Sequence, residues 1–173
     1  NASYRKEWLL HTQNEPKTDG PLIVAECGKG RLFCNTLLPE RADLKKVGGP
    51  GREFWASGKN WDLHPDFVVS ANKRAKEIGV GPYFGNWRVE VSPAEAALND
   101  RFLHVINVSG TDSGKPIECR KVQTETEDKA IIAIPDCEVD GLRGKLEAEI
   151  GFNRVGPVMA SVKYSLFDGS GKN

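Results

Sequence analysis

Short runs of β-forming residues, separated by clusters of Gly, Pro, Asn and Asp, recur along most of this chain. In the clearest run, Trp87–Val91, three apolar residues alternate strictly with Arg88 and Glu90. Such alternation is typical of a strand with one buried face, because successive side chains of a strand point to opposite sides. No 3.6-residue pattern is sustained over three helical turns. The sequence therefore predicts an all-β protein.

The runs also predict how the strands are joined. Strands are expected at residues 8–12, 22–27, 31–38, 87–91, 102–108, 117–122, 129–134, 145–150 and 158–166. The second and third are joined by Gly28-Lys29-Gly30, whose glycines supply the positive φ angles that a tight turn needs. Two packed antiparallel sheets are the natural way to bury about ten alternating strands. We expect one antiparallel β-sandwich domain over residues 1–173.

The pattern loosens between Pro39 and Gly85. This region contains the glycine-rich stretch Val47–Gly51 and three large aromatic residues, and residues 70–78 are just long enough for a short helix. A long ordered loop with several aromatic residues usually packs across a sheet face or shapes a site. We expect one long irregular loop region here.

Charge and hydropathy exclude two classes of partner. The chain has 24 basic and 24 acidic residues, so its formal net charge is +0. A nucleic-acid-binding protein usually shows a basic excess or a basic stripe, and the small basic groups here are interpreted as solvated faces. No run approaches the roughly 18 apolar residues of a membrane-spanning helix. We expect neither nucleic acid nor a membrane as a partner.

The four cysteines fall into two local pairs, Cys27 with Cys34 and Cys119 with Cys137. Neither pair has the C-x-x-C spacing of a metal or redox site. Both pairs flank predicted hairpins, so two disulfides would suit an exported protein. Four separate buried thiols fit equally well, because cysteine often behaves as a small core residue. The sequence leaves these alternatives open.

The best ligand-like group of residues lies in the irregular region: Trp55 and Trp61, with Arg52, Lys59 and Asn60. Sugar rings stack on indoles, while Arg and Lys pair with carboxylate or sulfate groups. The alternative is that both indoles anchor the loop by packing beneath it. We take these five residues as the candidate substrate-binding site.

Three histidines have ordinary structural interpretations. His11 lies beside Trp8 on an apolar strand, where a hydrogen-bonded structural role is the usual one. His64 lies between Asp62 and Asp66 in a turn-like stretch, which suggests surface turn chemistry. Alternation places His104 on the exposed side of its strand. No nucleophile arrangement such as Ser-His-Asp follows from these spacings.

Several stretches, in order along the chain, resemble the C-terminal β-sandwich region of the heparinase II/III-like polysaccharide lyases. They are Lys6–Thr12 followed by Asn14-Glu15-Pro16, Gly30–Phe33, Thr36–Glu40, Val47–Trp55, Trp87–Pro93 and Asp100–Val105. The resemblance covers residues 6 to 108; the remainder fits only as a generic β pattern.

This resemblance implies an exported enzyme, periplasmic or secreted, with an N-terminal α/α toroid preceding the sandwich. Such lyases cleave uronic-acid polysaccharides by β-elimination, and their catalytic base and acid come largely from the toroid. The chain would then be a C-terminal fragment without catalytic residues, whose partners are the toroid and an acidic polysaccharide. Some members hold zinc in the sandwich, and His11 resembles the last ligand of that site. The fragment itself would need no cofactor.

Three functions are therefore open. The chain is expected to be a non-catalytic accessory domain of such a lyase, with a free-standing carbohydrate-binding module and a purely structural sandwich as the alternatives. Heparin-like, alginate-like and other uronic-acid polymers all remain candidate ligands.

Overall fold

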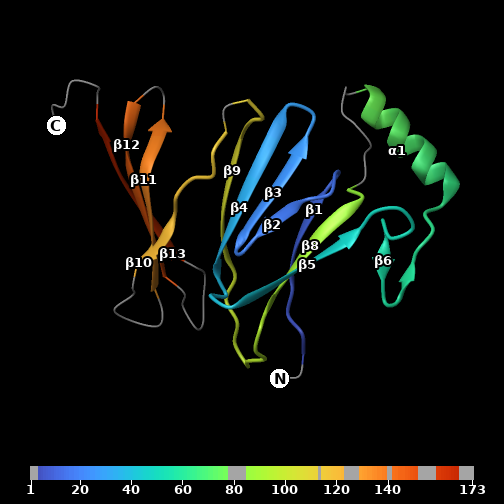
Figure 1. Ribbon diagram of the computed structural model, residues 1–173, viewed down its shortest axis with the longest axis horizontal. Helices are drawn as coiled ribbons and strands as arrows, with labels where there is room; N and C mark the ends of the chain where they lie inside the picture. Colours follow the sequence, from blue (N-terminus) through green and yellow to red (C-terminus); the bar gives the residue numbers. More distant parts are fainter. Residues whose placement is uncertain are drawn as a thin grey trace. The chain divides into compact units, whose positions relative to one another are not determined.

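The computed structural model describes residues 4–77, 85–112, 114–122, 129–139, 142–151 and 159–167. In these ranges the chain consists of antiparallel strands and one helix, which confirms the all-β prediction (Figure 1). The chain divides into two compact units, unit 1 (Asn1–Gly114) and unit 2 (Lys115–Asn173), where the sequence analysis expected one domain.

Unit 1 contains two antiparallel sheets and a small hairpin. Its strands are β1 (Trp8–Thr12), β2 (Lys17–Asp19), β3 (Leu22–Cys27), β4 (Gly30–Leu38), β5 (Ala42–Gly48), β6 (Trp55–Ala56), β7 (Lys59–Asn60), β8 (Trp87–Pro93) and β9 (Leu103–Gly110). One sheet has the order β1-β8-β5 and the other the order β2-β3-β4-β9, while β6 pairs with β7 (Figure 1). The expected irregular region thus contains a full edge strand, β5.

The two sheets of unit 1 share one core, which confirms the antiparallel sandwich. Ile23 and Cys34 come from the four-stranded sheet, Val89 and Val91 come from β8, and all four are 0% exposed. The partly buried residues packed against them are Trp8, Leu10, Leu32, Ala42 and Leu44. Burying a Val or Ile side chain stabilises a fold by roughly 1.5–3 kcal/mol. The apolar alternation read in the sequence of β8 is therefore the inner face of the sandwich.

The β3–β4 hairpin forms as predicted, and its register excludes a disulfide between Cys27 and Cys34. Cys27 lies opposite Gly30, and Cys34 lies opposite Ile23. The two cysteines are therefore about four residues apart along the hairpin, roughly 13 Å at the rise of a strand, whereas bridged Cα atoms lie within about 7 Å. Cys27 is an exposed free thiol. The side chain of Cys137, and with it the second predicted pair, lies outside the described residues.

The prediction that His104 lies on an exposed sheet face is wrong. β4 pairs with β9 so that His104 lies opposite Thr36, which is on the inner side of β4 with Cys34. The imidazole stacks on the Trp8 indole with a centroid separation of 3.7 Å, and its Nδ1 lies 3.2 Å from Thr36 Oγ1. Its Nε2 is buried and has no hydrogen-bond partner among the described residues.

Burial of His104 makes the stability of unit 1 depend on pH. Desolvation lowers the pKa of His104 to about 4, so the unfolded chain binds more protons than the folded one between about pH 6.5 and pH 4. The shift is worth about 3 kcal/mol, of which stacking of the charged ring on Trp8 would offset about 1 kcal/mol. We expect unit 1 to lose about 2 kcal/mol of stability as the pH falls through this window.

The matched variant for this prediction is His104→Phe, which keeps an aromatic ring against Trp8 but cannot titrate. Urea unfolding at several pH values measures the effect, and all four tryptophans of the chain lie in unit 1 to report it. An equal pH dependence in His104→Phe would contradict the assignment to His104.

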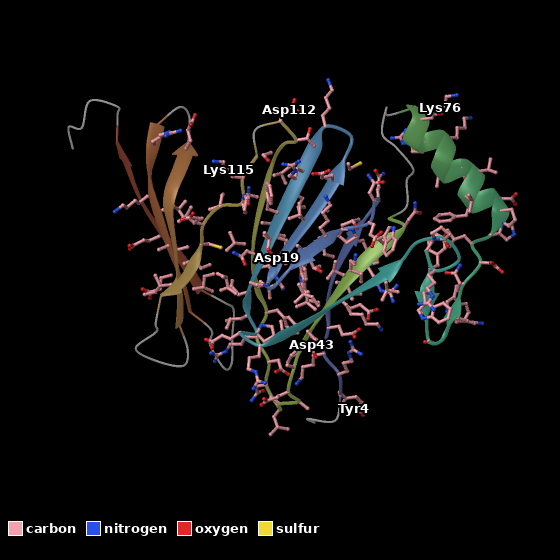
Figure 2. All side chains as sticks on the ribbon, viewed as in Figure 1. Tyr4, Asp19, Asp43, Lys76, Asp112 and Lys115 are labelled. Carbon is pink, nitrogen blue, oxygen red and sulfur yellow. The ribbon has the colours of Figure 1, made fainter. Side chains whose placement is uncertain are left out.

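The helix α1 (Pro65–Glu77) begins earlier than the predicted start at Ser70. Proline suits the first helical position, because its missing N–H would have no partner there. Asp66 lies in the first turn, and Arg74 and Lys76 lie in the last turn, where they complement the helix dipole. Figure 2 labels Lys76 near the end of the helix. None of the described helical segments has the length and apolar character needed to cross a membrane.

Unit 2 is a four-stranded antiparallel sheet with the order β10-β11-β12-β13. Its strands are β10 (Arg120–Val122), β11 (Lys129–Val139), β12 (Leu142–Gly151) and β13 (Met159–Phe167). The predicted hairpin between residues 117–122 and 129–134 is confirmed by the β10–β11 pairing. A register irregularity lies between Ile134 and Cys137.

Candidate functional site

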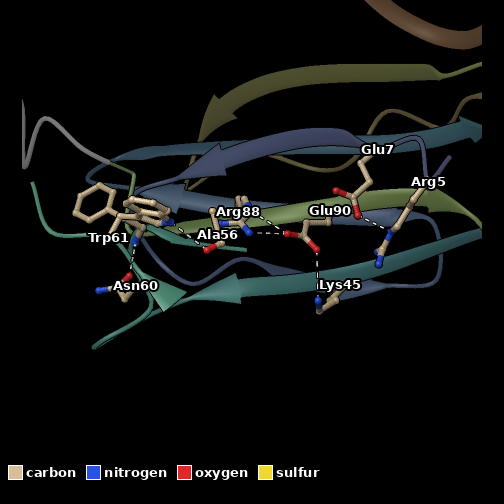
Figure 3. Close-up of polar contacts among 9 residues, drawn as sticks. Arg5, Glu7, Lys45, Ala56, Asn60, Trp61, Arg88 and Glu90 are labelled. Atoms are coloured by element: carbon tan, nitrogen blue, oxygen red, sulfur yellow. Dashed lines mark hydrogen bonds and ion pairs between the residues drawn. The ribbon is translucent and has the colours of Figure 1, made fainter. Parts of the chain in front are cut away.

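The outer face of the three-stranded sheet carries charged side chains. Arg88 and Glu90 alternate on β8 with the core valines, and the sheet register places His11 opposite Arg88 and Leu9 opposite Glu90. On the other side of β8, Lys45 lies opposite Glu90. Leu9, His11, Arg88 and Glu90 form the floor of the pocket described below. Figure 3 shows Arg88 and Glu90 with Lys45, which lies beside this floor.

Arg88 and Glu90 form a buried ion pair on this floor. Arg88 donates to Glu90 Oε1 from both Nη2 and Nε, at 2.6 Å and 2.9 Å, and the side chains are 15% and 9% exposed. Lys45 Nζ lies 3.5 Å from the other carboxylate oxygen. Burial raises the pKa of Glu90, but hydrogen bonding and charge from Arg88 and Lys45 together outweigh burial and lower it. Glu90 is therefore held as a carboxylate.

The β6–β7 hairpin, which contains most of the predicted binding residues, is held together by side-chain hydrogen bonds. Trp55 pairs with Asn60 across the hairpin. Asn60 Oδ1 accepts a bond of 2.8 Å from the Phe54 amide, and Trp61 Nε1 donates to the Ala56 carbonyl at 3.0 Å (Figure 3). The Asn60 side chain thus shapes the hairpin.

Two glycines attach this hairpin to the sheet. Gly48 and Gly49 have φ angles of +148° and +81° and lie against Trp87 at the end of the β5–β8 ladder. A Cβ on Gly48 would lie 2.3 Å from the Asn86 carbonyl oxygen, and one on Gly49 would lie 2.7 Å from the Trp87 ring. Only glycine fits both positions, so the close approach fixes where the chain leaves the sheet.

Each indole of the hairpin has a cation over its ring. The Arg52 guanidinium lies 4.8 Å from the Trp55 ring centroid, and Lys59 Nζ lies 3.5 Å from that of Trp61. Trp61 is 49% exposed. Cation–π contacts of this kind contribute about 0.5–1 kcal/mol at exposed sites, and here they place positive charge beside both aromatic rings.

A pocket of about 460 Å³ lies between the sheet floor and the start of the hairpin. Its lining comes from β1, β8 and the segment leading into β6: Glu7, Leu9, His11, Glu53, Phe54, Trp55, Ala56, Gly85, Arg88 and Glu90. This volume falls in the range of small-molecule binding sites. The pocket combines aromatic and aliphatic surface with a few polar groups.

The five predicted binding residues lie in one short segment of the sequence, residues 52–61. Of these, Trp55 lines the pocket, and so does His11, which the sequence analysis treated separately. Sequence reasoning missed Glu53, Arg88 and Glu90 as lining residues. The alternation of Arg88 and Glu90 with buried valines was the available signal, but it does not show what covers the outer face.

His11 alone does not fit a zinc site. It is exposed on β1, and the part of the chain that the structure describes has no group of three or more His, Cys, Asp or Glu residues placed to hold a metal ion. Zinc prefers four ligands. His64 Nδ1 lies 3.6 Å from Asp66 Oδ2, and both side chains are strongly exposed, in agreement with the surface-turn interpretation.

No protein-family model matches this chain, and no curated protein matches it.

Proposed function

We propose that unit 1 is a non-catalytic carbohydrate-binding β-sandwich that holds an acidic polysaccharide through the pocket and the β6–β7 hairpin. The observation that carries the proposal is that Trp55, Arg52 and Lys59 lie in one short segment, residues 52–61, beside a pocket that Trp55 lines. Indole faces bind the apolar face of a sugar ring, and the two cations suit the acid groups of the polymer.

The resemblance to heparinase II/III-like lyases supports a place for this unit in a larger exported enzyme. In that setting the sandwich would hold the polysaccharide while an upstream α/α toroid supplied the catalytic base and acid. The proposed role for the residues described here is binding, with no bond made or broken by this chain alone. The parent enzyme's zinc, if it has one, would require ligands besides His11.

Truncation of the pocket tryptophan tests the proposal. Trp55→Ala removes the ring that lines the pocket and receives Arg52, so we expect the affinity for an acidic polysaccharide to fall at least about tenfold, or about 1.4 kcal/mol. Isothermal titration of the full chain with uronate polymers measures it. Trp61→Ala, outside the pocket lining, should have the smaller effect.

The matched control is Tyr4→Ala, which removes another aromatic side chain that is 72% exposed and does not line the pocket (Figure 2). It should bind the polymer as the unmodified chain does. Absence of binding by the unmodified chain, or equal affinity in Trp55→Ala, would contradict the proposed function.

A further inference from the structure

The Lys and Arg side chains around the pocket fall into two groups. Arg88 lines the pocket, whereas Arg52 and Lys59, called the rim cations below, lie outside the lining. Arg88 is the one Lys or Arg among the lining residues, and two of its nitrogens already donate to Glu90. Glu7, also in the lining, pairs with Arg5. Among the described residues, a negatively charged ring entering the pocket would therefore meet no lining Lys or Arg that is not already paired with a carboxylate.

Glu53 gives the interior an excess of negative charge. Its oxygens accept bonds from the Gly51 amide at 3.2 Å and from Asn60 Nδ2 at 3.4 Å, and within the described ranges it pairs with no cation. A carboxylate in this state accepts hydrogen bonds from hydroxyl groups but repels another carboxylate. His11, on the floor, is a second hydrogen-bonding group for a hydroxyl.

The apolar lining suits one face of a sugar ring. Leu9, Phe54 and Trp55 supply aliphatic and aromatic surface that matches the C–H face of a pyranose, and Glu53 and His11 are hydrogen-bonding groups for its hydroxyls. The free cationic groups lie elsewhere: Arg52 and Lys59 contact the indoles but do not line the pocket.

We infer that the pocket binds an uncharged, hydroxyl-bearing sugar ring, that Glu53 excludes a uronate from it, and that acid groups on neighbouring rings lie at Arg52 and Lys59. The inference rests on the proposed function and deepens it. It requires a polymer in which charged and uncharged rings alternate, rather than one in which every ring carries a carboxylate.

Two oligosaccharides with the same number of rings test it. In a galacturonate oligomer every ring is charged, whereas in a hyaluronan oligomer uronate alternates with an uncharged hexosamine. If rim cations alone decided the affinity, the galacturonate oligomer would bind tighter because it carries more charge. We expect the hyaluronan oligomer to bind the full chain at least about tenfold tighter. Equal or tighter binding of the galacturonate oligomer would overturn the inference.

The variant Glu53→Gln tests the assigned residue. It should reduce that affinity ratio at least about fivefold, mainly by improving galacturonate binding. Glu95→Gln is the matched control, since it removes the same charge from an exposed carboxylate that pairs with Arg41 outside the pocket. A ratio unchanged by Glu53→Gln contradicts the role of Glu53 while leaving Trp55-dependent binding, and so the proposed function, intact. If the unmodified chain shows no Trp55-dependent binding of either oligosaccharide, both the inference and the proposed function are contradicted.

Discussion

Gly48→Ala should lower the free energy of unfolding of unit 1 by about 4 kcal/mol, the largest effect expected from a single methyl group here. The backbone at Gly48 has a φ angle of +148°, which side-chain-bearing residues rarely adopt. The new Cβ would also lie 2.3 Å from the Asn86 carbonyl oxygen and 2.6 Å from Trp87 Cα. Both neighbours are backbone atoms, so relief requires β5 and β8 to separate. Urea unfolding followed by tryptophan fluorescence measures the loss.

Gly51→Ala is the matched control in the same loop. Gly51 also has a positive φ angle, +76°, but its Cβ would meet nothing within 4 Å. It should cost only the backbone strain, about 1–2 kcal/mol. Equal losses in the two variants would show that strain alone, and not the contact with β8, determines the requirement at Gly48.

Arg88→Met should destabilise unit 1 by about 3 kcal/mol at neutral pH, because it leaves the Glu90 carboxylate buried without its main partner. Lys45 at 3.5 Å retains part of the compensation. In the intact protein the lowered pKa of Glu90 stabilises the fold above about pH 4.5, and this contribution disappears as the pH falls through the folded-state pKa. In the variant the pKa of Glu90 rises, so the stability difference should shrink toward acid pH.

The double variant Arg88→Met with Glu90→Met separates charge from packing. Replacing both partners of a buried pair by apolar side chains is often neutral, so we expect it to recover most of the lost stability. Chemical unfolding of both variants at pH 7 and pH 5 makes the comparison. A double variant as unstable as Arg88→Met would show that packing, and not the unpaired charge, causes the loss.

The sequence predicted those strands whose alternation reports burial on one face. β1, β3 and β8 are found at or within two residues of their predicted ends, because the core side of each is apolar. β5 escaped prediction because Lys46, opposite the core residue Val89, interrupts its apolar side and instead pairs with Glu15. Charged residues on an edge strand are common because they discourage pairing with other chains.

The position of His104 shows a second limit of alternation. Its neighbours Leu103 and Val105 are more hydrophobic, so a local pattern assigns them the core side, whereas pairing with Thr36 places the imidazole there. The core side at this point is set by the partner strand and by Trp8 from the other sheet. By contrast, the sequence could have excluded a Cys27–Cys34 disulfide. The two-residue turn at Gly28-Lys29 fixes the register of the whole hairpin, and this register keeps the two cysteines apart.

The candidate site was predictable in composition but not in extent. The residues of segment 52–61 are near one another in sequence, and their aromatic and basic character was visible there. The pocket depends on β1 and β8 meeting this segment, a long-range arrangement that places Glu53 near His11 and Arg88. Local pattern carries no information on such a meeting.

The attachment of the hairpin at Gly48 and Gly49 has a consequence for how this protein can diversify. Both glycines lie against Trp87, and no residue of segment 52–61 belongs to the core cluster shared by the two sheets among the described residues. Substitutions in this segment therefore change the aromatic and charged surface offered to a ligand without disturbing inter-sheet packing. Selection, or a library built for engineering, can therefore vary the segment while Asn60 keeps the hairpin in shape and Gly48 and Gly49 keep it attached at the same place on the sandwich.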